Sequence, residues 1–218
     1  NDNFYLSGIR PSDTGLFSSL QAGAGADTLN LSDSLLAVTD PATLTGFEAV
    51  TLTRGSELTL DGTLLALGDT RDDAAGTGYS VSGDSTLRII GAGDTAFGSF
   101  LRGAGTLAAS AQGNAFNFSS NNAAAAGQDF TGTLMLNDAT FALGGLNAQA
   151  LAASRLLAGS GSTVRVADGV QRIGGLAFDG GTVAFDTGTP GESEAKGSVQ
   201  TASLLNLNGS GTVQVNAG

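Results

Sequence analysis

Two glutamates, Glu48 and Glu57, are the residues in this sequence whose type and spacing come closest to a catalytic pair. Both lie in or beside short runs of apolar residues, whereas most other acids stand beside glycine or in polar segments. Glycoside hydrolases use two carboxyl groups about 5 to 10 Å apart. The nine-residue step between Glu48 and Glu57 indicates neighbouring strands of one structural repeat. A polysaccharide-degrading enzyme is therefore the least favoured function.

The sequence contains no histidine and no cysteine. A Ser-His-Asp triad, a Cys-His pair and a histidine zinc site are therefore excluded within this chain. We expect no enzymatic activity and no cofactor.

The segment 22–30, AGAGADTLN, nearly fits the calcium-binding nonapeptide G-G-x-G-x-D-x-U-x. Calcium shared between turns needs a further carboxylate nine residues on, and none follows Asp27. Later glycine turns carry Thr106 or Ser162 at the corresponding position. We interpret Asp27 as a bend that precedes a strand, and we expect no metal site.

The net charge of −11, with eight arginines and the single lysine Lys196, disfavours nucleic acid and anionic membranes as partners. The chain has no run of 18 apolar residues, so we expect no membrane insertion. Glycine is abundant at 34 residues, and only 13% of residues are charged, so serine, threonine and asparagine must supply much of the polar surface.

Short runs of the form small-x-[Leu/Val]-x-[apolar] recur along the whole chain. They begin at Asp27, Ser56, Ser85, Gly105, Gly132, Ser162, Gly181 and Gly211. The mean step between them is about 26 residues, within the range of solenoid repeats. Alternation of this kind is typical of a half-buried strand. Further strand candidates lie between them, at 47–52, 62–67, 139–143, 175–178 and 203–207.

A repeat of this length with two or three strands predicts one coil of a parallel β-helix. We expect one elongated all-β domain over 1–218, with about seven to nine coils and mostly three faces. A β-sandwich is the main alternative fold, although the sequence has few hairpin signals. The best helix candidate, 147–158, lacks a clean apolar stripe.

Four segments, 43–62, 130–143, 173–191 and 205–215, give the chain a resemblance to passenger domains of bacterial autotransporters. The AIDA-like and pertactin-like adhesins are the most similar types. The resemblance implies a right-handed parallel β-helix, secretion across the outer membrane, and a position at the bacterial surface or outside the cell. It also implies that the chain is part of a longer passenger. Roles in that family vary, so the resemblance does not select one.

Three segments depart from the strand pattern and are candidate binding loops: 67–80, 111–128 and 186–198. The first carries Arg71, Asp72, Asp73 and Tyr79, which could bind a cation, a sugar or a partner strand. The second carries Asn121 and Asn122 in a polar lobe. Such segments are often only solvated turns.

The strand faces are the other candidate surface, because a β-helix presents ladders of Ser, Thr and Asn. Examples of the threonines that we expect in such ladders are Thr51, Thr53, Thr59 and Thr63. Hydrogen bonds between two ladders predict homotypic cell–cell aggregation and biofilm formation. Adherence to a host glycan or matrix protein, and a purely structural stalk, remain the alternatives.

Overall fold

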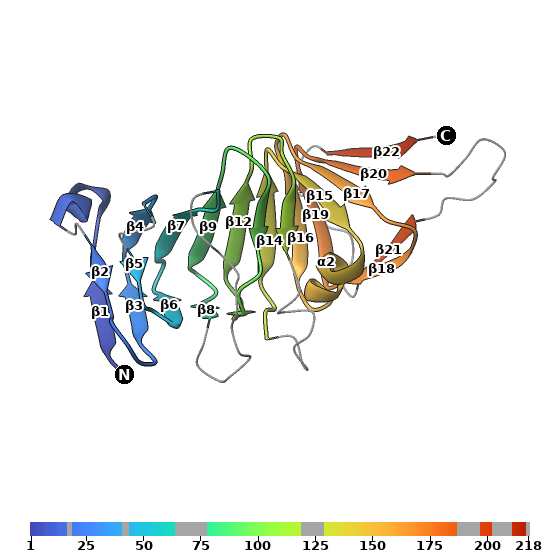
Figure 1. Cartoon of the computed structure of the whole chain (residues 1–218). Coiled ribbons are helices and arrows are strands. Elements are labelled where there is room, and N and C mark those ends of the chain that lie inside the picture. The colour runs from blue at the N-terminus through green and yellow to red at the C-terminus, as the bar shows by residue number, and fades with distance from the viewer. Residues whose placement is uncertain are drawn as a thin grey trace.

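The computed structural model describes residues 1–16, 19–40, 44–63, 78–118, 129–186, 197–201 and 211–216. Its strands stack in parallel as successive coils of one elongated β-helix, with β1 at one end and β22 at the other (Figure 1). Every strand pairing between named elements is parallel, which confirms the predicted fold class and excludes the hairpins of a sandwich.

The coils have three faces, which we name by their order in the chain. The first face holds β1 (Asn3–Ser7), β3 (Thr28–Ser32), β6 (Ala49–Thr53), β8 (Gly78–Val81) and β11 (Leu101–Arg102). The second face holds β4 (Leu35–Val38), β7 (Glu57–Asp61), β9 (Thr86–Ile90), β12 (Thr106–Ser110), β14 (Thr133–Asn137), β16 (Arg155–Gly159) and β19 (Gly175–Asp179).

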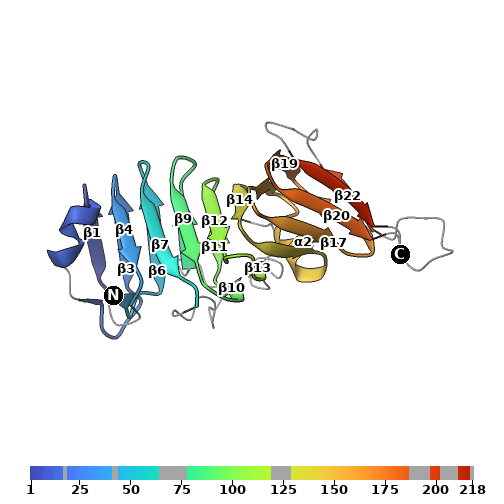
Figure 2. The same cartoon turned by 90° about the horizontal axis from the view of Figure 1, so that it is seen from above.

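The third face is less continuous, since three separate sheets contribute to it. It holds β2 (Leu20–Gln21) with β5 (Leu44–Thr45), then β10 (Thr95–Phe97) with β13 (Phe116–Phe118), and then β15 (Thr140–Leu143), β17 (Thr163–Val166), β20 (Thr182–Asp186) and β22 (Thr212–Asn216). A bridge between Ala115 and Thr140 joins the last two groups. Figure 2 shows β17, β20 and β22 side by side on this face.

The core is built from columns of apolar side chains, one from each coil, in register. On the second face Leu58, Leu87, Leu107, Leu134 and Leu156 pair in succession, and all have 0% exposure. Burial of one leucine stabilises the fold by about 1.5–3 kcal/mol. A single coil has nothing to bury its inner face against, so the coils are stable only when stacked.

A small residue precedes each strand of the second face where the chain turns from the first face. This corner column consists of Ser34, Ser56, Ser85, Gly105, Gly132, Ser154 and Gly174. Coils approach closely here: a Cβ on Gly132 would lie 1.9 Å from the Gly105 carbonyl oxygen. The small first position of the repeated pattern is therefore a packing requirement.

The short helix α2 (Gly145–Ala150) interrupts the regular coil and lies against β18 (Gly169–Ile173). The 3-10 helix η1 (Pro11–Leu16) covers β4, and β21 (Gly197–Thr201) pairs with β18. Helix α2 overlaps the predicted candidate 147–158, but β16 begins already at Arg155. The buried Asn147 fixes α2, since its side chain accepts a hydrogen bond from Phe118 N and donates one to Ala142 O.

The repeat derived from the sequence needs one correction, because it mixes the three faces. Asp27 precedes a first-face strand, the starts from Ser56 to Gly132 precede second-face strands, and those from Ser162 onward precede third-face strands. The coil after Asp27 continues at Glu48 rather than at Ser56. Two of the predicted steps, from Asp27 to Ser56 and from Gly132 to Ser162, therefore span one full coil and one additional face.

Candidate binding surface

The outer side of the first face carries a regular polar ladder, as does the third face, where Thr140, Thr163, Thr182 and Thr212 pair in register. The central row of the first face runs in register through Tyr5, Asn30, Thr51, Ser80 and Arg102. Tyr5 is 76% exposed, and the other four are half-buried. Neighbouring strands are about 4.8 Å apart, so five strands give a polar row of about 19 Å.

A second row of hydroxyls flanks the first. Ser7, Ser32 and Thr53 pair in register, and the Thr53 hydroxyl donates to Leu31 O at 3.2 Å. The first face therefore offers hydroxyl, amide, phenol and guanidinium groups at regular spacing. Such a flat surface can hydrogen-bond another surface but encloses no small molecule.

The four threonines expected in polar ladders lie on different surfaces. Thr51 and Thr53 are on the first face, whereas Thr59 lies in β7 on the second face, between Ala37 and Arg88. Thr63 follows β7 at a corner, where its N–H and hydroxyl donate to Asp61 Oδ1 at 2.9 and 2.7 Å. The four threonines therefore belong to different surfaces, because a chain turn separates Thr53 from Thr59.

Tyr79 is not the loop residue that the sequence indicated. It lies in β8, paired with Val50 and Leu101, and its ring contacts the core phenylalanine Phe97 with 5.5 Å between ring centroids. Burial raises the pKa of its hydroxyl to about 12. Tyr79 is therefore a partly buried strand residue that packs against the core, and not a residue of a protruding loop.

The remaining predicted loop residues, Arg71, Asp72, Asp73, Asn121 and Asn122, lie outside the described residues, as does most of 186–198. Phe116 and Phe118 at the start of the second loop belong to β13 and have 1% and 0% exposure. The prediction that these two rings alternate as core residues is confirmed.

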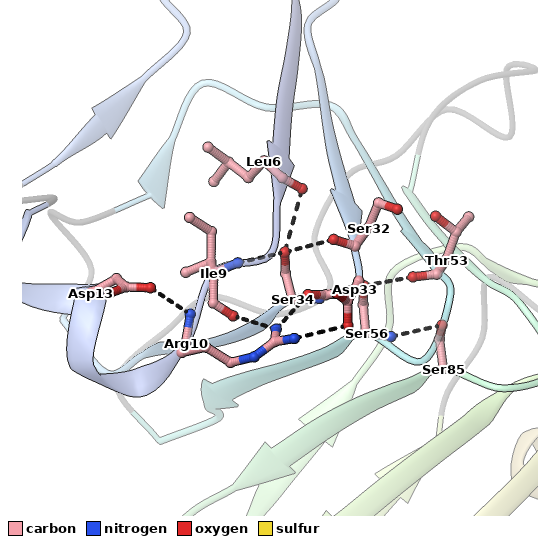
Figure 3. A network of polar contacts seen from close by, with 10 residues as sticks. All are labelled: Leu6, Ile9, Arg10, Asp13, Ser32, Asp33, Ser34, Thr53, Ser56 and Ser85. Atoms are coloured by element: carbon pink, nitrogen blue, oxygen red, sulfur yellow. Dashed lines mark hydrogen bonds and ion pairs between the residues drawn. The ribbon is translucent and has the colours of Figure 1, made fainter.

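The corner between the first and second faces contains a chain of buried hydrogen bonds (Figure 3). Ser34 N donates to Ser56 Oγ and Ser56 N donates to Ser85 Oγ, both at 3.2 Å. Each serine hydroxyl thus accepts the N–H of the preceding coil. The three serines are 0–1% exposed, so these bonds satisfy backbone groups that water does not reach.

The outer rim of this corner is closed at the N-terminal end by an ion pair. Arg10 lies 3.0 Å from Asp33 Oδ1 and also donates to the Asp33 carbonyl (Figure 3). Asp33 has a φ of 49°, a left-handed conformation that aspartate adopts more readily than most side chains.

Glu48 and Glu57 lie at the starts of successive strands, β6 and β7, as the sequence predicted. Both glutamates form hydrogen bonds to neighbouring coils. Glu57 forms a two-bond ion pair with Arg88 of the next coil, at 2.7 and 3.2 Å, and these hydrogen bonds hold the pKa of Glu57 below its usual value. Glu48 accepts a hydrogen bond from Asp27 N at 2.7 Å.

Asp27 occupies a corner before β3, as the sequence indicated, and is 1% exposed. Its Oδ1 accepts a hydrogen bond from Asp2 N, just as Glu48 accepts one from Asp27 N. Asp2, Asp27 and Glu48 directly precede paired strands, so the carboxylates of Asp27 and Glu48 each bond the N–H of the preceding coil. Among the described residues no three acids are grouped closely enough to hold a metal ion.

Sequence reasoning missed Tyr5, Asn30, Ser80 and Arg102. A signal existed for Asn30, which stands between the buried Leu29 and Leu31. A signal also existed for Ser80, because the step from Ser56 to Ser85 equals the step from Thr51 to its partner Ser80, 29 residues in both cases. In the part of the chain that the structure describes, no helix is long and apolar enough to span a membrane.

Two curated relatives, both from Escherichia coli K12, are similar to this chain. The uncharacterized protein YuaQ is 36% identical over 132 residues, which is 61% of this chain and 9% of YuaQ. The uncharacterized lipoprotein YdeK is 34% identical over 170 residues, which is 74% of this chain and 12% of YdeK. The chain thus spans about a tenth of each relative's length. No protein-family model and no solved structure matches it.

Proposed function

We propose that this chain is a segment of a bacterial surface adhesin of the autotransporter passenger type, and that its first face mediates aggregation between cells. The observation that carries the proposal is the in-register row from Tyr5 through Asn30, Thr51 and Ser80 to Arg102. A rigid rod displaying this row can align many weak bonds with a second copy. Similarity to a protein described as a lipoprotein supports a location in the cell envelope.

The energetics favour many contacts over a few strong ones. One hydrogen bond contributes only about 1 kcal/mol net. Many such bonds in register, repeated over many copies on two cells, give adhesion through multivalency. The net charge of −11 opposes the approach of two copies, but salt screens this repulsion beyond about 8 Å at physiological ionic strength.

The test compares aspartate substitutions on two faces in cells that display the protein. Asn30→Asp with Thr51→Asp places like charges in neighbouring coils of the first face and should abolish clumping. Thr140→Asp with Thr163→Asp makes matched changes in neighbouring coils of the third face and should leave clumping intact. Clumping of the wild type should survive salt of about 0.5 M, since its contact consists of hydrogen bonds and not of ion pairs that salt would screen.

Mixed populations distinguish the alternatives. A homotypic contact gives clumps of displaying cells only, whereas equal recruitment of non-displaying cells indicates a heterologous receptor, such as a glycan or matrix protein. If displaying cells neither clump nor adhere, the segment is a stalk. Loss of clumping in the third-face variant alone would indicate that the contact between cells lies on the third face.

A further inference from the structure

The corner between the first and second faces differs between the two ends of the molecule. At the N-terminal end, the ion pair of Arg10 with Asp33 covers its outer rim. Farther along, the corner carries a polar groove with a volume of about 260 Å³. Its walls come from four successive coils, and its lining includes Thr131, Gly132, Thr133, Arg155 and Gly174.

Arg155 is the only charged side chain among the described residues that line this groove. It is exposed at the start of β16, in register with Thr133 on one side and Gly175 on the other. No carboxylate of the described residues pairs with its guanidinium, in contrast to Arg88, which Glu57 neutralises. On a chain with net charge −11, Arg155 is thus an uncompensated cation in a groove.

The neighbours of Arg155 leave room for a ligand and supply hydroxyls. Gly174 and Gly175 place no side chain beyond the guanidinium, so a planar group can approach it from that side. Thr131 and Thr133 line the opposite part of the groove, and neither hydroxyl is bonded to another described residue. A fork of N–H donors beside two hydroxyls matches a carboxylate that is carried by a polyhydroxylated ring.

We propose that this groove binds an acidic sugar, with Arg155 pairing with its carboxylate and Thr131 and Thr133 bonding its hydroxyls. The groove is smaller than the roughly 300–1,000 Å³ of pockets that enclose drug-sized ligands, so it accommodates one sugar unit and not a buried chain. Acidic sugars occur on host cells and on bacterial surfaces, and the carboxylate is the shared chemistry. The site is separate from the first-face row and does not depend on aggregation.

The experiment uses the full chain and saturation-transfer NMR with glucuronate, N-acetylneuraminate and glucose as probes. At least one acidic sugar should show transfer, and glucose should show none. Preference for N-acetylneuraminate would indicate a host source, and preference for glucuronate a source that includes bacterial polysaccharide.

Matched substitutions test the role of Arg155 in binding. Arg155→Gln should weaken binding at least about tenfold, since it removes a charge-assisted pair. Arg165→Gln makes the same change at an exposed arginine of the third face and should leave binding unchanged. Arg155→Lys keeps the charge but loses the fork, so its binding should fall between that of the wild type and that of Arg155→Gln. Absence of transfer from both acidic sugars, equal transfer from glucose, or equal losses in Arg155→Gln and Arg165→Gln would overturn the proposal.

Discussion

Removing one hydroxyl from the buried serine corner tests whether the hydrogen bonds between coils stabilise the β-helix. In Ser56→Ala, the backbone N–H of Ser34 loses the Ser56 Oγ acceptor that lies 3.2 Å away. The same hydroxyl donates to Thr53 O at 2.6 Å, but that carbonyl keeps the N–H groups of Asp33 and Ser56, each at 3.3 Å. The substitution therefore leaves one buried donor unsatisfied.

The expected loss of stability depends on whether the remaining donor keeps another acceptor. An unsatisfied buried donor destabilises a fold by about 1–3 kcal/mol, whereas losing a bond whose partner keeps a second acceptor costs about 0.5–1.5 kcal/mol. Ser85→Ala is the second case, because Ser56 N still has Thr53 O at 3.3 Å. We therefore expect Ser56→Ala to be more destabilising than Ser85→Ala, although both hydroxyls accept at 3.2 Å.

The assay is urea unfolding followed by circular dichroism, together with native-state hydrogen exchange at the Ser34 amide. Exchange is needed because stacked coils can open locally before the whole chain unfolds. Ser7→Ala, at an exposed position of the first face, is the control and should change stability by less than about 0.5 kcal/mol. The reasoning fails if Ser56→Ala is as stable as this control, or if the Ser34 amide of Ser56→Ala exchanges at the wild-type rate.

Three further outcomes are expected. Gly132→Ala should destabilise the chain by about 1–3 kcal/mol in urea unfolding, because its Cβ would meet the Gly105 carbonyl at 1.9 Å; unchanged stability would show that the coils can separate there. Arg88 lowers the pKa of Glu57 below 4.5, so the pair stabilises the fold above the unfolded pKa, and this is lost as pH falls through the folded pKa. Unfolding at several pH values should show Glu57→Gln less stable by about 0.2–1 kcal/mol near neutrality and equal to the wild type in acid, and a constant difference would contradict this. EDTA should leave the melting temperature unchanged, and a drop of several degrees would indicate a metal ligand at Asp27.

The apolar alternation and its recurrence about every 26 residues were enough to predict the fold class. Runs such as Thr133–Asn137 bury every second residue, and a small residue precedes them because the coils meet closely at that corner. These are local requirements, so they are visible in a single repeat. The same alternation identifies Phe116 and Phe118 as core residues, and both are buried.

The assignment of strands to faces could not be predicted from the sequence. Every face of a β-helix buries alternate residues, so the pattern around Asp27 and the pattern around Ser56 are alike although they lie on different faces. The coil length also varies, since the step from Leu58 to its partner Leu87 is longer than the step from Leu87 to its next partner, Leu107. The corners differ in length and account for this difference in coil length, whereas the strands keep their alternating pattern.

The composition of the candidate surfaces depends on how strands of successive coils pair, and not on a pattern within one strand. Thr51 and Thr53 share a face with Asn30, while Thr59, only six residues after Thr53, faces another side because the chain turns at Arg54 and Gly55. Arg88 is paired because Glu57 lies diagonally from it on the neighbouring strand, whereas no described acid pairs with Arg155. The sequence by itself determined which residues point inward along each strand, since burial of every second side chain is a local pattern. Only the stacking of the coils decided which outward residues become neighbours, because such contacts join residues a whole coil apart and depend on where each corner turns.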